Sequence, residues 1–377
     1  MKVLEVNVDD RGFGGVYSLL LSVIRNKPQD LQLDIGALET FEDQSNIDYL
    51  ESMGSHVYYL GYDGNKLKKQ AKIYQNVKAL LEKEKYDCVH IHSDVANKLL
   101  VSGLAAKAAG VPKIILHSHA TGVDMANGKM RERVHMICRR LLPKIHGEYA
   151  ACSKVAAKWM FPYAVEKGNV TYIHNGIETK RFCYDEKIRL EERSKLGLKP
   201  EDRLIGHTGR FMYVKNQLFL VKVFDKALTT WKNQGNHGEL KLLLVGTGEM
   251  MEDVKHLAEH LGIINNIIFY GQCKKIECLY QAMDIFAMPS HFEGLGMAAV
   301  EAQSTGLPCI VSTGVPQDVD IYGSVKFLSI DEQSEVVWAS SFCEDLPKRI
   351  DHTADICKAG YSIQDTVDQF VKLYQDK

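Results

Sequence analysis

The chain has 377 residues, of which 45% are hydrophobic and 25% are charged, and its formal net charge is −2. This composition is ordinary for a soluble globular protein. The near-neutral charge excludes a nucleic-acid binder that works through a strongly basic field. Because the chain is longer than one hydrophobic core usually serves, we expect two domains.

The nine cysteines are scattered, odd in number and without a CxxC pair, which is typical of a reduced, intracellular protein. The N-terminus, MKVLEVNVDD, is a charged β-type segment with no apolar signal region. No apolar run is long enough to span a bilayer. We therefore expect a cytoplasmic protein, and peripheral contact with the inner face of the membrane is a further hypothesis.

Short β-branched segments alternate with helical patterns along the first part of the chain. Helices are predicted over 15–25, 67–84 and 94–109. The predicted strands are VLEVNV, LQLDIGAL, HVYYL, DCVHIH, KIILHSH and GEYAAC. Strand–helix alternation predicts a parallel sheet built from right-handed crossovers.

The pattern then restarts with VTYIH, RLIGHTG, LKLLLVG, NIIFYG, DIFAMPS, LPCIVS and VKFL. Two runs of about six strands predict the α/β class with two doubly wound, Rossmann-like domains. We place the N-terminal domain at residues 1–172, closed by a C-terminal helix over 361–377. The second domain covers residues 173–360. Ligands of such sheets lie beyond the carboxyl ends of the strands.

The loop GFGG (12–15) follows the first predicted strand and opens a helix, so its N–H groups can approach an anionic oxygen. It is close to a dinucleotide fingerprint, with Asp34 near the position of a ribose-binding acid. However, Tyr17 stands where the third glycine is required, and Asp34 lies within a strand. A tight turn without a ligand remains an equal alternative.

The segment GHTGRFMYVKNQ (206–217) follows the first strand of the second domain. Arg210 and Lys215 lie on the loop and early in the next helix, where both can converge on one anion. A guanidinium that binds in a bidentate manner and a point-charge ammonium suit a diphosphate. Two solvated surface cations are the alternative.

The segment HFEGLGMAAVE (291–301) follows DIFAMPS and carries two glutamates. Gly294 and Gly296 allow the backbone to close on a ligand at the start of a helix, whose free N–H groups can hold a phosphate. Glu301, one turn into that helix, can accept two hydrogen bonds from the vicinal diol of a ribose. Alternatively, Glu293 complements a helix dipole and Glu301 is an ordinary surface residue.

The segment HSHATG (117–122) ends a strand of the first domain. A histidine at such a strand end can act as a general acid or base or bind a sugar, or it can be a satisfied core residue. The residues leave open whether His117 or His119 has this role.

Together, GHTGRF…KNQ, LVGTGE, FYGQC and PSHFEGLGMAAVEAQSTGLPCIVS resemble the retaining glycosyltransferases of family 4, in particular bacterial exopolysaccharide-type members. The resemblance covers nearly the whole chain. It implies the GT-B fold, with two Rossmann-like domains that face a cleft. It also implies an acceptor-side first domain and a nucleotide-sugar-binding second domain.

The resemblance also implies roles for individual residues. Glu301 would bind the donor ribose, and Glu293 would face the donor sugar together with His119. Arg210 and Lys215 would bind the diphosphate, which the backbone at Gly14 and Gly15 would reach from the other domain. The backbone at Cys273 would flank the base, and the helix start would contribute Gly294, Leu295, Gly296 and Met297.

These inferences predict an enzyme that moves a sugar from a nucleoside diphosphate sugar, with a UDP-sugar favoured, to a glycan or lipid-linked acceptor. Retention and a role in extracellular or capsular polysaccharide synthesis follow from the resemblance. No cofactor and no metal are expected, because cationic side chains can replace a metal at the diphosphate. The alternatives are a nicotinamide-dependent oxidoreductase and a non-catalytic partner of another transferase.

The segment KMRERVHMICRRLLPKI (129–145) contains six basic residues and one acid, Glu132. Val134, Ile137, Leu141 and Ile145 recur at helical spacing, which is typical of a basic amphipathic helix. The segment either docks on an anionic membrane or packs its apolar stripe on its own sheet.

Overall fold

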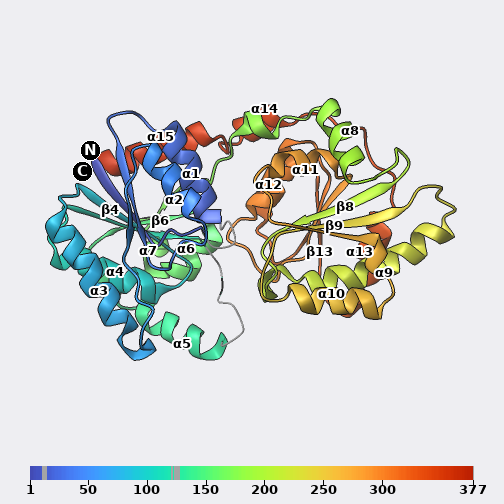
Figure 1. Cartoon of the computed structure of the whole chain (residues 1–377). Coiled ribbons are helices and arrows are strands. Elements are labelled where there is room, and N and C mark those ends of the chain that lie inside the picture. Colours follow the sequence, from blue (N-terminus) through green and yellow to red (C-terminus); the bar gives the residue numbers. More distant parts are fainter. Residues whose placement is uncertain (11–14, 120–121, 123–127, 377) are drawn as a thin grey trace. The chain divides into compact units, whose positions relative to one another are not determined.

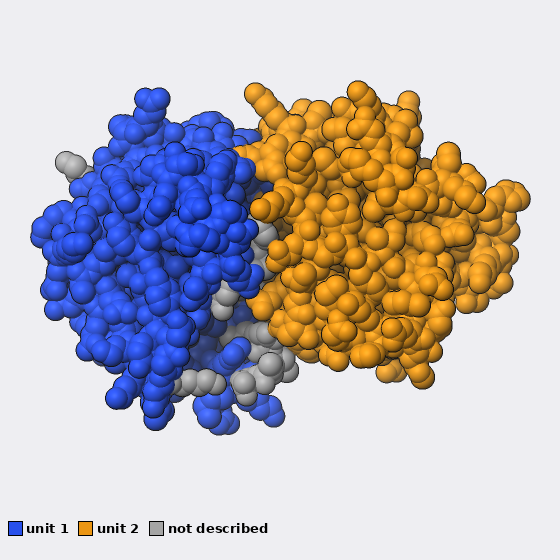
Figure 2. Space-filling view, in the orientation of Figure 1, with its two compact units in different colours: residues 1–177, 360–377 blue, residues 178–359 orange. Residues whose placement is uncertain are grey.

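The computed structural model describes residues 1–10, 15–119, 122 and 128–376 (Figure 1). The chain forms two compact units, which Figure 2 colours separately. Unit 1 contains Met1–Ile177 and the C-terminal segment from Gly360, and unit 2 contains Glu178–Ala359. The boundaries lie within a few residues of the predicted ones, and the C-terminal helix joins unit 1.

Unit 1 contains a parallel seven-stranded sheet in the order β3-β2-β1-β4-β5-β6-β7. Its strands are β1 (Lys2–Val6), β2 (Gln32–Ala37), β3 (Val57–Tyr59), β4 (Cys88–Ser93), β5 (Lys113–Ser118), β6 (Glu148–Ala151) and β7 (Thr171–Tyr172). Its helices are α1 (Gly15–Asn26), α2 (Gln44–Ser52), α3 (Lys66–Lys83), α4 (Ala96–Ala108), α5 (Gly128–Arg139), α6 (Lys154–Met160), α7 (Pro162–Glu166) and α15 (Ile363–Gln375).

Helices cover both faces of the unit 1 sheet (Figure 1). Leu4, Val89 and Leu116 point to one face and pack in a core with residues of α3 and α4. Val3 and Ile115 point to the other face and pack with α1 and α15. Both faces of the central strands are therefore buried, as expected for a parallel sheet. The strand order reverses between β1 and β4, so this is the switch point where ligands of such sheets bind.

Unit 2 contains a parallel six-stranded sheet in the order β10-β9-β8-β11-β12-β13. Its strands are β8 (Arg203–Thr208), β9 (Leu240–Val245), β10 (Ile267–Gly271), β11 (Ile285–Met288), β12 (Cys309–Ser312) and β13 (Val325–Leu328). Its helices are α8 (Glu186–Lys195), α9 (Gln217–Asn233), α10 (Met251–His260), α11 (Ile276–Ala282), α12 (Met297–Ser304), α13 (Glu335–Phe342) and α14 (Thr353–Lys358).

The core of unit 2 packs the apolar faces of α9, α10 and α13 against β8 and β9, with Phe224 and Trp338 among its fully buried side chains. The strand order reverses between β8 and β11. The loops that carry Arg210 and Glu293 follow these two strands, so they flank one switch point.

The predicted α/β class with two Rossmann-like parallel-sheet domains is confirmed. The placement of VTYIH at the start of the second run is wrong. The two residues of this segment that form a strand, β7, pair with β6 in the first sheet. Among the described residues, no helix has both the length and the apolar character needed to cross a bilayer.

Candidate functional site

The loop after β8 presents the two predicted diphosphate-binding cations. Arg210 is exposed, and its Nη2 lies 3.3 Å from Glu249 Oε2, an ion pair that contributes little because both side chains face solvent. Lys215 is half-buried and lies beside Gly209. Because the Arg210 guanidinium is held only weakly, it can turn to an incoming anion.

Hydrogen bonds of two buried residues, His207 and Gln217, hold this loop in place. His207 Nδ1 lies 2.9 Å from the Ala287 carbonyl oxygen of β11, and its Nε2 lies 3.2 Å from Gln217 Nε2. The Gln217 amide donates to the Arg210 carbonyl oxygen at 3.0 Å. Burial lowers the pKa of His207 to about 4, so the imidazole of His207 is neutral. These contacts fix the backbone of Arg210 relative to both strands of the switch point.

The loop after β9 approaches the loop after β8 so closely that it requires a glycine at position 246. Gly246, at the end of β9, has φ 131°, and a Cβ there would lie 2.2 Å from the Gly209 carbonyl oxygen. The next loop is attached in turn, because Gly246 N donates to the Gly271 carbonyl oxygen at 2.8 Å. Cys273, half-buried after β10, therefore lies on the third of three connected strand-end loops.

The loop after β11 carries Glu293, whose carboxylate oxygen lies 2.6 Å from Lys215 Nζ. Both side chains are largely shielded from solvent. The loop is held at Glu293 N, which donates to the Gly314 carbonyl oxygen. The structure thus brings one predicted cation and one predicted carboxylate into direct contact.

Helix α12 begins directly after this loop. Gly296 has φ 97°, and a Cβ there would lie 2.8 Å from Met288 Cε, so glycine fits both the conformation and the space. Gly294 and Leu295 are buried before it, and Met297 is the first helical residue. The first N–H groups of a helix have no partner within the helix, so this backbone can bind an anion.

Glu301 lies one turn into α12 and accepts a hydrogen bond from the Tyr280 hydroxyl at 2.9 Å. Tyr280 comes from α11 and also pairs with Thr208 Oγ1 at the end of β8. Burial raises the pKa of Glu301 to about 7, although the hydrogen bond from Tyr280 opposes this. The Glu301 carboxyl therefore titrates near neutral pH, and a diol that donates to the carboxylate would favour ionisation.

In unit 1, Gly14 lies outside the described residues, and Gly15 is the exposed first residue of α1. Asp34 is buried, and its carboxylate is used within the protein. It accepts from His56 N at 3.0 Å and from the Tyr86 hydroxyl at 2.8 Å, and Lys2 Nζ lies 3.6 Å away. These contacts argue against a ribose-binding role for Asp34 and against the oxidoreductase alternative.

The two histidines at the end of β5 differ in exposure. His117 is fully buried, whereas His119, one residue beyond the strand, keeps part of its surface exposed. Only His119 is placed at the edge of the sheet where a ligand can touch it. His117 pairs instead with His90 of β4, whose Nε2 lies 3.0 Å from His117 Nδ1.

Among the described residues, His90, His92 and His117 form a group whose ring nitrogens lie close enough together that they could hold a metal ion. All three are buried and take part in hydrogen bonds with one another or with their neighbours. The expectation that the enzyme needs no metal stays a prediction.

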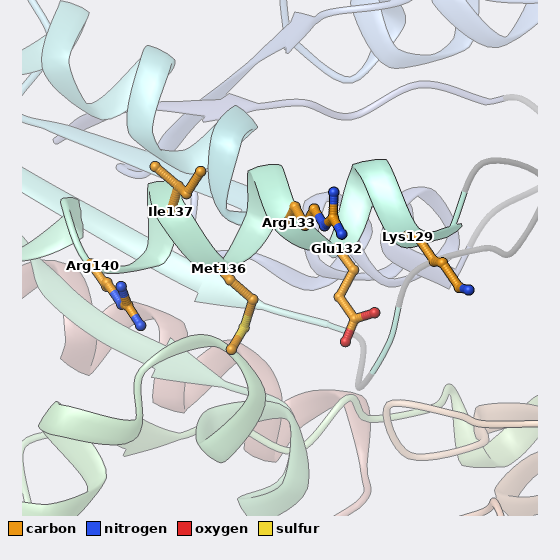
Figure 3. Close-up of a pocket in the computed structure, with 6 residues that line it drawn as sticks. All are labelled: Lys129, Glu132, Arg133, Met136, Ile137 and Arg140. Atoms are coloured by element: carbon orange, nitrogen blue, oxygen red, sulfur yellow. The ribbon is translucent and has the colours of Figure 1, made fainter.

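Helix α5 presents an exposed basic and apolar surface (Figure 3). The α5 surface consists of Lys129, Glu132, Arg133, Met136, Ile137 and Arg140, which line one shallow depression. Ile137 is 62% exposed, and the adjacent Met130 is 68% exposed. The predicted single stripe is wrong, because α5 ends at Arg139 and Ile145 is buried in the following turn.

The opposite side of α5 attaches the helix to unit 1. His135 stacks on Trp159 with ring centroids 4.2 Å apart, and its Nδ1 accepts from Ala96 N. Arg139 Nη1 donates to the Trp159 carbonyl oxygen at 2.7 Å. Arg139, which the sequence suggested as a membrane contact, is therefore a structural residue.

Sequence reasoning missed several polar residues at the same strand ends. Tyr280 donates to Glu301 and also pairs with Thr208, and His207 with Gln217 supports Arg210. In unit 1, Glu5 and His92 contact His119 directly or through one another. The available signal was a polar side chain inside an otherwise apolar strand, as in HIH (90–92) and GHT (206–208).

Two family profiles match the chain. The family described as Glycosyltransferase Family 4 matches residues 45–181, and the family described as Glycosyl transferases group 1 matches residues 188–328. The glycosyltransferase EpsF of Bacillus subtilis is 30% identical over 331 residues, which cover 86% of this chain and 83% of EpsF.

A second relative is the UDP-Gal:alpha-D-GlcNAc-diphosphoundecaprenol alpha-1,3-galactosyltransferase of Escherichia coli. It is 30% identical over 242 residues, which cover 62% of this chain and 59% of that protein. Among solved structures, Anabaena HepE in complex with UDP and glucose has a TM-score of 0.79 at 17% identity, with both chains fully covered. The glycosyltransferase WaaG has a TM-score of 0.68 at 15% identity, also over both full chains.

Proposed function

Because the chain belongs to family 4 of the glycosyltransferases and has their GT-B fold, we propose that it transfers a sugar from a UDP-sugar to a glycan or lipid-linked acceptor with retention of configuration. The observation that carries the proposal is the set of groups around the β8/β11 switch point. Arg210, Lys215 and Glu293 flank it, and the start of α12 follows.

The reaction breaks the bond between the anomeric carbon and an oxygen of the β-phosphate, so negative charge develops on the leaving diphosphate. Preorganised positive groups stabilise that charge. In the proposal, Arg210 and Lys215 contact the diphosphate, and the backbone from Gly294 to Met297 supplies N–H groups to it.

The carboxylates have separate roles in this proposal. Glu301 accepts hydrogen bonds from the ribose diol, and the base lies against the backbone at Cys273. Glu293 exchanges Lys215 for hydroxyl groups of the donor sugar when the diphosphate arrives. The family resemblance further predicts that His119 contacts the sugar and that the backbone at Gly14 and Gly15 contacts the diphosphate.

Three observations support the finer parts of the proposal. The E. coli relative is named for a UDP-sugar and a lipid diphosphate acceptor, and HepE was crystallised with UDP and glucose. The exposed α5 surface combines the cations Lys129, Arg133 and Arg140 with apolar side chains, which suits an anionic membrane that holds a lipid-linked acceptor. A role in extracellular or capsular polysaccharide synthesis is proposed on the same basis.

A thermal-shift series tests the donor class. The protein is heated with UDP-, GDP- and ADP-sugars and with each free nucleoside diphosphate. At 100 times its Kd, a ligand stabilises the folded protein by about 2.7 kcal/mol. UDP and a UDP-sugar should raise the Tm, and the donor that does so should then be consumed in a transfer or hydrolysis assay. Stabilisation by NADH alone would instead support the oxidoreductase alternative.

A further inference from the structure

A network of buried polar side chains lies on the α15 face of the unit 1 sheet. Glu5 belongs to β1, His92 to β4 and His119 follows β5, and strand alternation directs them to one face together with Val3, Cys88 and Ile115. The apolar members occupy the amino-terminal half of each strand. The polar members therefore gather at the carboxyl end, where ligands of parallel sheets bind.

Three of these residues form a hydrogen-bonded series that leads out of the core. His119 Nε2 lies 2.8 Å from His92 Nδ1, and His92 Nε2 lies 2.7 Å from Glu5 Oε2. Glu5 and His92 are fully buried, whereas His119 is partly exposed. We call Glu5, His92 and His119 the relay.

The Glu5 carboxylate is ionised. Burial alone would raise the pKa of this carboxyl, but the adjacent His90 ring and hydrogen bonds from His90 and His92 outweigh burial and hold the pKa well below its usual range. The other oxygen accepts from the Tyr374 hydroxyl at 2.6 Å. An ionised carboxylate has no proton to donate, so each of its neighbouring polar groups must donate to it.

His92 is neutral, because burial, together with the neighbouring His90 ring, lowers its pKa to about 4. Its single proton must therefore lie on Nε2, which faces Glu5, and its Nδ1 must be a hydrogen-bond acceptor. His119 then has to donate from Nε2 to His92. Burial also lowers the pKa of His119, so the remaining nitrogen of this neutral ring, Nδ1, carries a lone pair.

His119 Nδ1 has no hydrogen-bond partner among the described residues, although the atom is buried. A buried polar atom without a partner costs free energy, so such an atom marks a place where a donor binds. The donor has to be a hydroxyl or N–H group of a water molecule or a ligand, because the lone pair can only accept.

We propose that Glu5 and His92 are positioning residues that fix the Nε2–H tautomer of His119, so that His119 Nδ1 accepts a hydrogen bond from a hydroxyl group of the bound sugar. This inference rests on the proposed function for the identity of the ligand. The assignment of the tautomer rests only on the relay. A single carboxylate at the far end thus determines how the ring at the sheet edge can bind.

Histidine ¹⁵N and ¹³C NMR on the full-length protein tests the tautomer without any turnover. In the wild type, His119, assigned through the spectrum of His119→Ala, should show a protonated Nε2 and an unprotonated Nδ1. Glu5→Gln keeps the shape of the side chain but supplies an amide that can donate or accept, so the tautomer of His119 should become mixed. Tyr374→Phe removes the hydroxyl that donates to Glu5 Oε1 and keeps the carboxylate, so it should preserve the tautomer.

Kinetics test the role in binding. Glu5→Gln should lower kcat by roughly 10–100-fold, the usual effect of losing an orienting partner, with a smaller change in KM. In a double-mutant cycle, Glu5→Gln should have no further effect once His119 is Ala. Tyr374→Phe controls for a loss of stability in the same core, and its folded fraction should turn over with a kcat close to that of the wild type.

Three results would overturn the relay. These are a proton on Nδ1 of wild-type His119, an unchanged tautomer in Glu5→Gln, and additive kinetic effects of Glu5→Gln and His119→Ala. A stoichiometric metal bound by His92 in the purified protein would also overturn it, since the metal would occupy a nitrogen that the relay uses. If no sugar nucleotide is turned over, the proposed function fails while NMR still decides the tautomer.

Discussion

The ammonium group of Lys215 and the carboxylate of Glu293 lie 2.6 Å apart, across the switch point between β8 and β11. The carboxylate therefore neutralises the cation that is proposed to receive the diphosphate. Anion binding has to compete with this ion pair, so its strength sets part of the affinity for the nucleotide.

Glu293→Gln should strengthen the binding of free UDP and weaken the use of the intact donor. The charge of Lys215 becomes available to the phosphates, whereas the proposed contacts between Glu293 and the sugar are lost. Isothermal titration with UDP and initial rates with the UDP-sugar measure the two effects. Glu249→Gln, which releases Arg210 at an exposed site, is the matched control and should change both values little. Weaker binding of UDP to Glu293→Gln would contradict the competition.

Arg210→Ala should lower turnover by roughly 10²–10³-fold, which is the usual effect of losing one preorganised contact to developing charge. Its stability should stay close to that of the wild type, since the side chain is exposed and its ion pair is weak. Steady-state kinetics and urea unfolding provide the two measurements. A wild-type kcat would remove Arg210 from the diphosphate site.

Lys215→Ala should lower turnover to a similar extent but should also destabilise the unliganded protein. It removes the ammonium group that pairs with the largely shielded carboxylate of Glu293. The double variant Lys215→Ala with Glu293→Gln should regain stability without regaining turnover. Recovery of turnover in the double variant would show that the cation has only a structural role.

The element positions were predictable to within a few residues because each strand of these sheets is a short apolar run bounded by turn residues. Arg210, Lys215, Glu293 and Glu301 could be selected as candidates because their segments follow such strands, and their roles stay predictions. The partners of these residues were not predictable, since they come from distant segments. Tyr374 and Glu5, for example, are 369 residues apart in the chain, and no local pattern links them.

The sequence also did not predict that the α5 surface is exposed. Periodicity predicted an amphipathic helix but could not tell which face would meet the sheet. The structure shows that stacking of His135 on Trp159 decides this orientation and leaves Ile137 exposed.

Glu301→Gln should stabilise the unliganded protein at pH 8 while it weakens nucleotide binding. Burial raises the pKa of the Glu301 carboxyl from 4.5 to about 7 in the folded state. Between these values the folded protein binds more protons than the unfolded chain, so stability falls as pH rises through this window. The variant should lose this decrease, which is roughly 1–3 kcal/mol.

Urea unfolding from pH 4.5 to pH 8 measures this difference. The hydrogen bond from Tyr280 opposes the rise in the pKa of Glu301. Tyr280→Phe removes this hydrogen bond, so the pKa of Glu301 should rise further in that variant. UDP affinity should fall as pH drops below about 7 in the wild type and should depend less on pH in Glu301→Gln. A steeper loss of stability at high pH in Glu301→Gln would show that the carboxyl is not responsible.

The α5 surface should bind anionic vesicles at low salt and release them at high salt. Each basic residue near an anionic leaflet contributes about 1 kcal/mol, and this attraction is screened within a Debye length. Co-sedimentation with vesicles that contain phosphatidylglycerol measures retention. Arg133→Glu with Arg140→Glu should abolish retention, and Ile137→Ser should weaken it at both salt concentrations, because the apolar part of the contact is not screened.

The control for this experiment is a double charge reversal of exposed lysines elsewhere in unit 1, Lys72→Glu with Lys83→Glu on α3. It matches the change in net charge and leaves the α5 surface intact, so retention should persist. Arg139 is unsuitable as a probe because it holds α5 on Trp159. If the control variant is released as readily as Arg133→Glu with Arg140→Glu, binding follows net charge and the α5 surface has no specific role.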